Sequence, residues 1–366
     1  MKKILCIDAG AIRGIAVCSY LYNLDIFLHE NGSSLFDYFD MFVGSSIGAL
    51  IISAIVYEKM SGKELLYELF SDENIHTILS GSQSEQDVRL LEQLSKYPST
   101  GKTSVIKKYT GNKNIQDSNG KDVVMLAVKL STKRVEFSSD RLLTGSYESI
   151  VDEPCISLSK EPLVFRSWSN ENYKLSEVCD ASSAAPVYFP ASYVHINQTE
   201  NSLDNFQSLY TESIQCIDGG VASSDPTMTG YIEALSKYGI KEDIRILSIG
   251  TGLYRSNGNT VPDDIGLEKW IEKGDLLGLL VNQPRDLGIQ NVRKLSSLLG
   301  HKYLRVNGYV PDLSFDNVSA SNINVLKRTG EEWYGMFESE FLELIYNESN
   351  FNKILKKLKQ YFVSSK

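Results

Sequence analysis

The stretch that decides the fold is MFVGSSIGALII, residues 41–52. An apolar run leads into the pattern G-x-S-x-G, and a second apolar run of helical length follows it. This order predicts a strand, a sharp turn that carries Ser46, and a helix, which together form a nucleophile elbow. Gly44 and Gly48 leave room for the turn and for close contact between strand and helix. Ser46 would stand at the helix N-terminus, where free N–H groups and the helix dipole favour negative charge.

A second loop of small residues lies upstream, between a predicted strand and a predicted helix. Residues 2–8 (KKILCID) are typical of an apolar strand, residues 9–14 (AGAIRG) form the loop, and an apolar pattern of helical period begins at Ile15. Such a loop exposes backbone N–H groups in a concave nest that can hold a phosphate or an oxyanion. The phosphate-binding patterns G-x-x-x-x-G-K-[ST] and G-x-G-x-x-G are absent here. This leaves an oxyanion hole or a plain strand–helix connection.

A third motif joins an aspartate to two glycines at the end of an apolar strand. Residues 213–217 (SIQCI) predict the strand, and residues 218–220 (DGG) follow it. An aspartate beside glycines is often only a turn residue. In a chain that also carries an elbow serine, Asp218 becomes a candidate base or orienting group.

These three motifs, in this order, resemble those of the patatin-like phospholipases. The family pattern is D-G-G-G-x-[RK]-G, then G-x-S-x-G, then D-G-G or D-G-A. The matching segments are residues 8–14 (DAGAIRG), 44–48 (GSSIG) and 218–220 (DGG). Residues 181–190 (ASSAAPVYFP) and 247–252 (LSIGTG) are similar to two further segments of the family. The resemblance covers roughly residues 1–330, and its ordered motifs make it far more specific than a lone G-x-S-x-G.

The resemblance implies both a fold and a reaction. The fold is α/β, with three layers (α/β/α), a mostly parallel central sheet and a nucleophile elbow. The reaction is the hydrolysis of lipid acyl esters, of the phospholipase A or lysophospholipase type, on a phospholipid or lysophospholipid and without metal or cofactor. Two alternatives stay open: a catalytically inactive patatin-fold module that binds lipid or a protein partner, and an acyltransferase.

The resemblance also implies roles for individual residues. Ser46 would be the nucleophile, and Asp218 its partner in a Ser-Asp dyad that needs no histidine. The oxyanion hole would come from the loop N–H groups around Gly10 and Ala11, with Arg13 beside the loop as the family's basic residue. The motif glycines that would support these groups are Gly14, Gly44, Gly48, Gly219 and Gly220.

The loop departs from the family pattern at two positions, where Ala9 and Ala11 replace glycines. An alanine keeps its N–H group, so the hydrogen-bond donors survive. A positive φ angle would nevertheless be strained for alanine. We expect both residues to have backbone angles that alanine adopts readily, with the N–H groups still facing Ser46.

An alternative catalytic arrangement is a Ser-Asp-His triad made of Ser46, Asp218 and His301. The chain has four histidines, and His301 precedes a predicted strand at residues 303–306. The order Ser, Asp, His is that of the α/β-hydrolases. Their elbow normally follows several strands, however, and here only one predicted strand precedes the elbow strand. The sequence therefore favours the dyad.

Composition limits the classes of protein to which the chain can belong. The apolar content of 42% is ample for a core, and the net charge of −9 argues against nucleic acid as a partner. No apolar run reaches about 18 residues, and the N-terminus enters the first strand directly, so neither a membrane span nor a signal peptide is expected. The cysteines are odd in number and lack C-x-x-C spacing, which favours a reducing compartment and a cytoplasmic location. They are Cys6, Cys18, Cys155, Cys179 and Cys216.

The pattern along the chain predicts one large domain over residues 1–330 and a C-terminal helical segment over 331–366. Within the domain, residues 62–120 suggest a helical region near the active-site entrance, and residues 196–209 a polar surface insertion. In the tail, residues 351–362 place apolar side chains on one helical face and lysines on the others. Such a helix can pack on the domain, or it can make peripheral contact with a membrane surface.

Overall fold

The structure is a computed structural model, and it describes residues 1–81, 94–137, 160–201, 207–253, 266, 276–311 and 314–346. The elements in chain order are β1 (Lys2–Ile7), η1 (Ala11–Arg13), α1 (Gly14–Glu30), α2 (Leu35–Tyr38), β2 (Met41–Ser45), α3 (Ile47–Tyr57), α4 (Gly62–Glu64), η2 (Leu65–Leu69), α5 (Asp72–Ile78), α7 (Ser99–Thr110), β3 (Asp122–Phe137), β4 (Glu161–Arg166), α8 (Leu175–Ser182), β5 (Ser192–Asn201), β6 (Gln207–Asp218), α9 (Gly219–Ala222), α10 (Thr227–Tyr238), β7 (Ile244–Ile249), α12 (Leu276–Leu299), β8 (Lys302–Val306) and α13 (Ala320–Ile345).

One mixed sheet runs through the molecule in the order β5-β6-β3-β2-β1-β7-β8, and β4 pairs with β3 off this path. The neighbours from β3 through β2, β1 and β7 to β8 are parallel, whereas β4, β5 and β6 pair antiparallel. Helical crossovers join the parallel strands, as parallel pairing requires. The predicted α/β fold with a mostly parallel sheet is confirmed.

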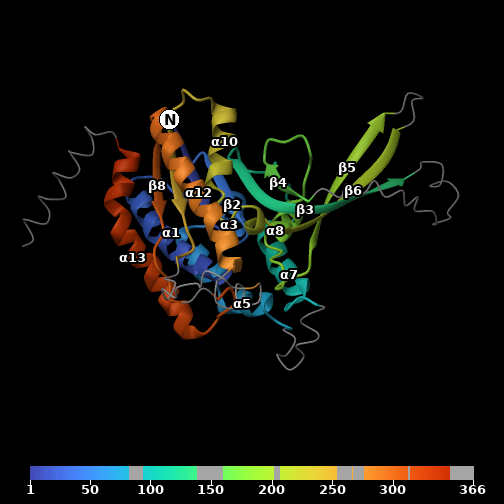
Figure 1. The fold of residues 1–366 in the computed structure, drawn as a ribbon, viewed down its shortest axis with the longest axis horizontal. Coiled ribbons are helices and arrows are strands. Elements are labelled where there is room, and N and C mark those ends of the chain that lie inside the picture. The colour runs from blue at the N-terminus through green and yellow to red at the C-terminus, as the bar shows by residue number, and fades with distance from the viewer. Residues whose placement is uncertain are drawn as a thin grey trace, which may run out of the picture.

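The sheet is covered on both faces because successive residues of its central strands point in opposite directions. In β1, Leu5 and Ile7 pack into a large core with α1, α3 and α13. The alternate residues Ile4 and Cys6 pack into a second core with α10 and α12. Figure 1 shows these helices on either side of the sheet, which gives the three predicted layers.

Helix α1 is a core helix, although residues 11–30 are long and apolar enough to cross a membrane. Of the most apolar window of this stretch, 72% is buried inside the protein. The helix packs against α13, where a Cβ on Gly330 would lie 2.2 Å from the carbonyl oxygen of Ala16. Burial between the sheet and α13 accounts for its apolar composition.

The structure describes some of the regions for which the sequence made predictions, and leaves others out. The region 62–120 contains α4, η2, α5 and α7. Of the polar stretch 196–209, residues 196–201 and 207–209 form the paired ends of β5 and β6, which extend away from the layered body in Figure 1. Helix α13 runs unbroken across the predicted boundary after residue 330. The amphipathic segment 351–362 and Cys155 lie outside the described residues.

Candidate active site

The predicted elbow lies at the C-terminal end of β2, between that strand and α3. Ser46 has φ 55° and ψ −122°, a conformation that a non-glycine residue rarely adopts and that functional sites retain when their surroundings enforce it. The surroundings here are tight. A Cβ on Gly44 would lie 2.6 Å from the Gly48 carbonyl, and a Cβ on Gly48 would lie 2.3 Å from the Ile7 carbonyl oxygen. Glycine at both positions therefore lets α3 start directly against β1 and β2.

Asp218 ends β6, which brings its carboxylate to Ser46 from the antiparallel side of the sheet. The Ser46 hydroxyl donates to Asp218 Oδ2 at 2.7 Å, and the Gly220 N–H donates to Asp218 Oδ1 at 2.6 Å. Gly219 must be small as well, because a Cβ there would lie 2.2 Å from the Leu126 carbonyl oxygen. The structure thus brings together the serine and the aspartate that the sequence singled out.

Burial sets the protonation behaviour of this carboxylate. Asp218 is only 5% exposed, and desolvation raises its pKa to about 6, although the hydrogen bonds from Ser46 and Gly220 and the charge of Lys102 oppose the rise. A carboxylate with a higher pKa is a stronger base. Asp218 is still largely ionised at neutral pH, so it can accept a proton there.

The loop after β1 holds two N–H groups for which no acceptor is found in the described part of the chain. They belong to Gly10 and Ala11, whereas the Ala9 N–H donates to the Ser224 carbonyl at 2.9 Å. The Arg13 side chain folds back onto the loop, and its Nε donates to the Gly10 carbonyl at 3.2 Å. Ala11 lines the same pocket as Ser46, so the loop borders the candidate nucleophile.

The expectation about the backbone angles of the two alanines holds for Ala9 and is wrong for Ala11. Ala9 has no positive φ, but Ala11 has φ 48°, in the left-handed region that favours glycine. The 3₁₀ turn of η1 begins at this residue, directly after Gly10. The fold therefore imposes on this alanine a conformation that its side chain opposes.

The Ser46 backbone has a partner that the sequence analysis did not identify. Its N–H donates to the hydroxyl of Ser182, at the end of α8, at 3.1 Å, so this N–H is not free for a substrate. The end of α8 is in turn fixed by Lys102, which is 2% exposed and donates to the Asp180 carbonyl at 2.8 Å. Ser182 lies in the A-S-S-A-A-P segment, and that motif was the only sequence signal for it.

A buried ion cluster lies behind the loop and was also missed. Arg305 on β8 donates from Nη1 to Asp8 Oδ1 and to the Ser248 hydroxyl, both at 2.7 Å, and from Nη2 to Asp8 Oδ2. Its Nη1 also lies 3.5 Å from Asp225 Oδ2. Asp8 is the first residue after β1, so this cluster anchors the start of the loop.

His301 is not part of the site, so the triad alternative is wrong. It directly precedes β8, whereas Ser46 follows β2, and the two strands run in the same direction in the sheet. The imidazole therefore lies at the N-terminal ends of the parallel strands, whereas the elbow lies at their C-terminal ends. There Nδ1 of His301 is 2.6 Å from the Tyr231 hydroxyl.

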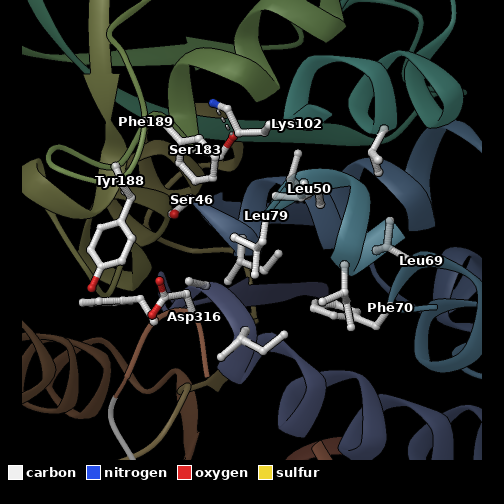
Figure 2. Close-up of a pocket in the computed structure, with 18 residues that line it drawn as sticks. Ser46, Leu50, Leu69, Phe70, Leu79, Lys102, Ser183, Tyr188, Phe189 and Asp316 are labelled. Atoms are coloured by element: carbon white, nitrogen blue, oxygen red, sulfur yellow. Dashed lines mark hydrogen bonds between the residues drawn. The ribbon is translucent and has the colours of Figure 1, made fainter. Parts of the chain in front are cut away.

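An apolar pocket extends from Ser46 between α3, α5 and α7, with a volume of about 110 Å³. In Figure 2, Ser46, Tyr188 and Asp316 lie on one side of this pocket, and Leu69 and Phe70 lie on the other. Among the described residues, no group of three His, Cys, Asp or Glu side chains could hold a metal ion. The pocket is lined by Ala11, Ile12, Ser46, Ile47, Leu50, Leu69, Phe70, Ile75, Ile78, Leu79, Lys102, Val105, Ser183, Ala185, Tyr188, Phe189, Phe315 and Asp316.

Comparison with known proteins places this geometry in a family. A model of the patatin-like phospholipases matches residues 5–231. Patatin-like protein 3 of Arabidopsis thaliana is 29% identical over 70% of this chain and 60% of its own length. Patatin-like protein 2 of Oryza sativa subsp. indica is 26% identical over 90% of this chain and 83% of its own length. The chain thus spans less than two thirds of the Arabidopsis relative.

Among solved structures, VipD from Legionella pneumophila matches 92% of this chain and 66% of its own, with a TM-score of 0.42 and 11% identity. The family model covers more than half of the chain, including the loop after β1, the elbow and Asp218. The chain belongs to the patatin-like phospholipase family.

Proposed function

We propose that this protein is a lipid acyl hydrolase of the phospholipase A or lysophospholipase type, in which Ser46 and Asp218 form the catalytic dyad. The observation that carries the proposal is the 2.7 Å hydrogen bond from the Ser46 hydroxyl to Asp218 at the wall of an apolar pocket. The hydroxyl has a base within reach, and the pocket offers apolar contact to a fatty acyl chain.

In the proposed reaction, the Ser46 oxygen attacks the carbonyl carbon of the acyl ester, and its proton passes to Asp218 Oδ2. Negative charge develops on the carbonyl oxygen, which the N–H groups of Gly10 and Ala11 would stabilise. When the tetrahedral intermediate collapses, the ester bond breaks and Asp218 returns the proton to the leaving alcohol. The acyl chain is then bonded to Ser46.

The second half of the reaction releases the acyl chain. A water molecule gives a proton to Asp218 while its oxygen attacks the acyl-enzyme carbonyl, and Ser46 leaves with that proton. The products are a fatty acid and free enzyme. Arg13 would act indirectly, because its Nε holds the Gly10 carbonyl and with it the direction of the loop N–H groups.

A fluorophosphonate probe and product analysis test this proposal together. We expect the probe to label Ser46, and mass spectrometry to detect free fatty acid from a phospholipid or lysophospholipid. If the probe labels Ser46 but the acyl group is transferred to an added alcohol and no free fatty acid forms, the protein is an acyltransferase. An unlabelled, folded protein that binds lipid would mean a catalytically inactive module.

The activity should depend on pH through Asp218. The residue acts as a base only when it has lost its proton, and its pKa is raised to about 6 because it is buried. We therefore expect kcat/KM for a short-chain ester to rise about tenfold per pH unit below pH 6 and to level off above it. An exposed aspartate would place the midpoint near pH 4. A profile that stays flat from pH 7 down to about pH 4.5 would contradict this role.

A further inference from the structure

A short segment far along the chain reaches the loop after β1, and we call Ser314, Phe315 and Asp316 the strap. The strap lies outside residues 5–231, which the family model matches. Phe315 and Asp316 nevertheless line the same pocket as Ser46 and Ala11. Figure 2 shows Asp316 at the side of the pocket where Tyr188 and Ser46 lie.

The strap holds the loop by one backbone contact and one ring contact. The Ile12 N–H donates to the Phe315 carbonyl at 3.2 Å. The Arg13 guanidinium lies over the Phe315 ring, 5.1 Å from its centroid, in a cation–π contact. Arg13 in turn holds the Gly10 carbonyl through both its N–H, at 3.1 Å, and its Nε. Ala11 is thus fixed on both sides, by Gly10 before it and by Ile12 after it.

The strap is itself held by a clasp, which joins Asp316 to Lys96 and Tyr97. Asp316 Oδ2 accepts from Lys96 Nζ at 2.6 Å and from the Tyr97 hydroxyl at 2.8 Å. The backbone N–H groups of Lys96 and Tyr97 donate to the carbonyls of Val187 and Tyr188, each at 2.8 Å. The Asp316 side chain is 11% exposed, so the ion pair is partly shielded from water.

We propose that the strap, clasped by Lys96, is a positioning device for the oxyanion loop, and this inference rests on the proposed hydrolase function. The left-handed conformation of Ala11 opposes its own side chain, so the loop would relax without an external brace. Relaxation would turn the Ala11 N–H away from the developing charge. Asp316 and Lys96 act through the loop and touch no reacting atom.

The first test breaks the clasp from either side, with Lys96→Met, with Asp316→Ala and with both. A deleted oxyanion donor costs about 10²–10³ in rate, so a misdirected one should cost about tenfold in kcat and in the rate of fluorophosphonate labelling. KM for a short-chain ester should stay within about twofold, and the double variant should lose no more than either single variant. The control is Lys113→Met, which removes a lysine of similar exposure from its ion pair with Glu58. Wild-type rates in the clasp variants would overturn the proposal.

The second test asks whether the loss passes through Ala11. Glycine adopts a positive φ without steric cost, so an Ala11→Gly loop needs less bracing. Asp316→Ala should therefore cost less than about threefold when it is introduced into the Ala11→Gly protein. If the loss stays at the level seen beside Ala11, the strap acts by another route and the proposal is overturned.

A third measurement does not depend on activity. Amide hydrogen exchange of the peptide that contains Gly10 to Arg13 should become at least about threefold faster in Asp316→Ala, and unchanged in Lys113→Met. If the wild-type protein is not labelled but exchange follows this pattern, the proposed hydrolase function fails and the strap still positions the loop. Unchanged hydrogen exchange in Asp316→Ala overturns the proposed positioning role of the strap, whether or not the enzyme is active.

Discussion

Ser46→Ala and Asp218→Asn should each lower kcat/KM by about 10⁴-fold or more and leave the fold intact. The first substitution removes the attacking oxygen. The second keeps the shape of the side chain, but the amide cannot take the serine proton. Because the two groups act as one unit, the double variant should lose little more than the worse single variant. The measurement is kcat/KM on a short-chain ester, with circular dichroism to verify folding.

The neighbouring serine provides a matched control. Ser45 is fully buried and its hydroxyl has no hydrogen-bond partner within the described residues, so Ser45→Ala should keep nearly all the activity. His301→Ala should retain most of the activity as well, because that imidazole pairs with Tyr231 at the opposite end of the parallel strands from Ser46. Substantial turnover by the Ser46→Ala protein would contradict the assignment of Ser46 and Asp218 as the catalytic dyad.

Arg305→Met should be the most destabilising of the substitutions considered, lowering the free energy of unfolding by about 3–5 kcal/mol. Arg305, Asp8 and Asp225 are all buried. Removing the guanidinium leaves two buried carboxylates close together without the cation that pairs with both of them. The measurement is urea unfolding at neutral pH. Arg328→Met is the control, because it breaks an exposed pair with Glu332 and should change stability by no more than about 0.5 kcal/mol.

The destabilisation should depend on pH with a definite sign. Burial raises the pKa of Asp8 to about 7 even though Arg305 opposes the rise, and the loss of Arg305 raises it further. When the pKa of a carboxyl group is higher in the folded than in the unfolded state, the protein loses stability as the pH rises from the unfolded pKa, about 4, to the folded pKa. The Arg305→Met protein should therefore be less impaired at pH 5 than at pH 8. Equal losses at both values would mean that the carboxylates are not the cause.

The sequence predicted those parts of the site that local backbone geometry dictates. The spacing of Gly44, Ser46 and Gly48 fits one strand–turn–helix arrangement, because a side chain on either glycine would collide with backbone. Asp218, at the end of an apolar strand and before two glycines, is also marked by its neighbours alone. The layers followed from the same kind of signal, since apolar strands alternate with helical patterns in the first part of the chain.

Only the tertiary structure decided which distant residues complete the site. Asp8 meets Arg305 because β8 lies two strands from β1 in the sheet, and no local pattern encodes that order. Phe315 and Asp316 reach the loop from a segment with no motif of its own, and Ala11 takes a left-handed angle that its residue type disfavours. His301 has the position in the chain order that a Ser-Asp-His triad requires, but it lies at the opposite end of the parallel strands from Ser46. Local spacing fixes turns and helix starts because neighbouring residues share one backbone, whereas contacts across the fold depend on strand order and packing, which the whole chain settles together.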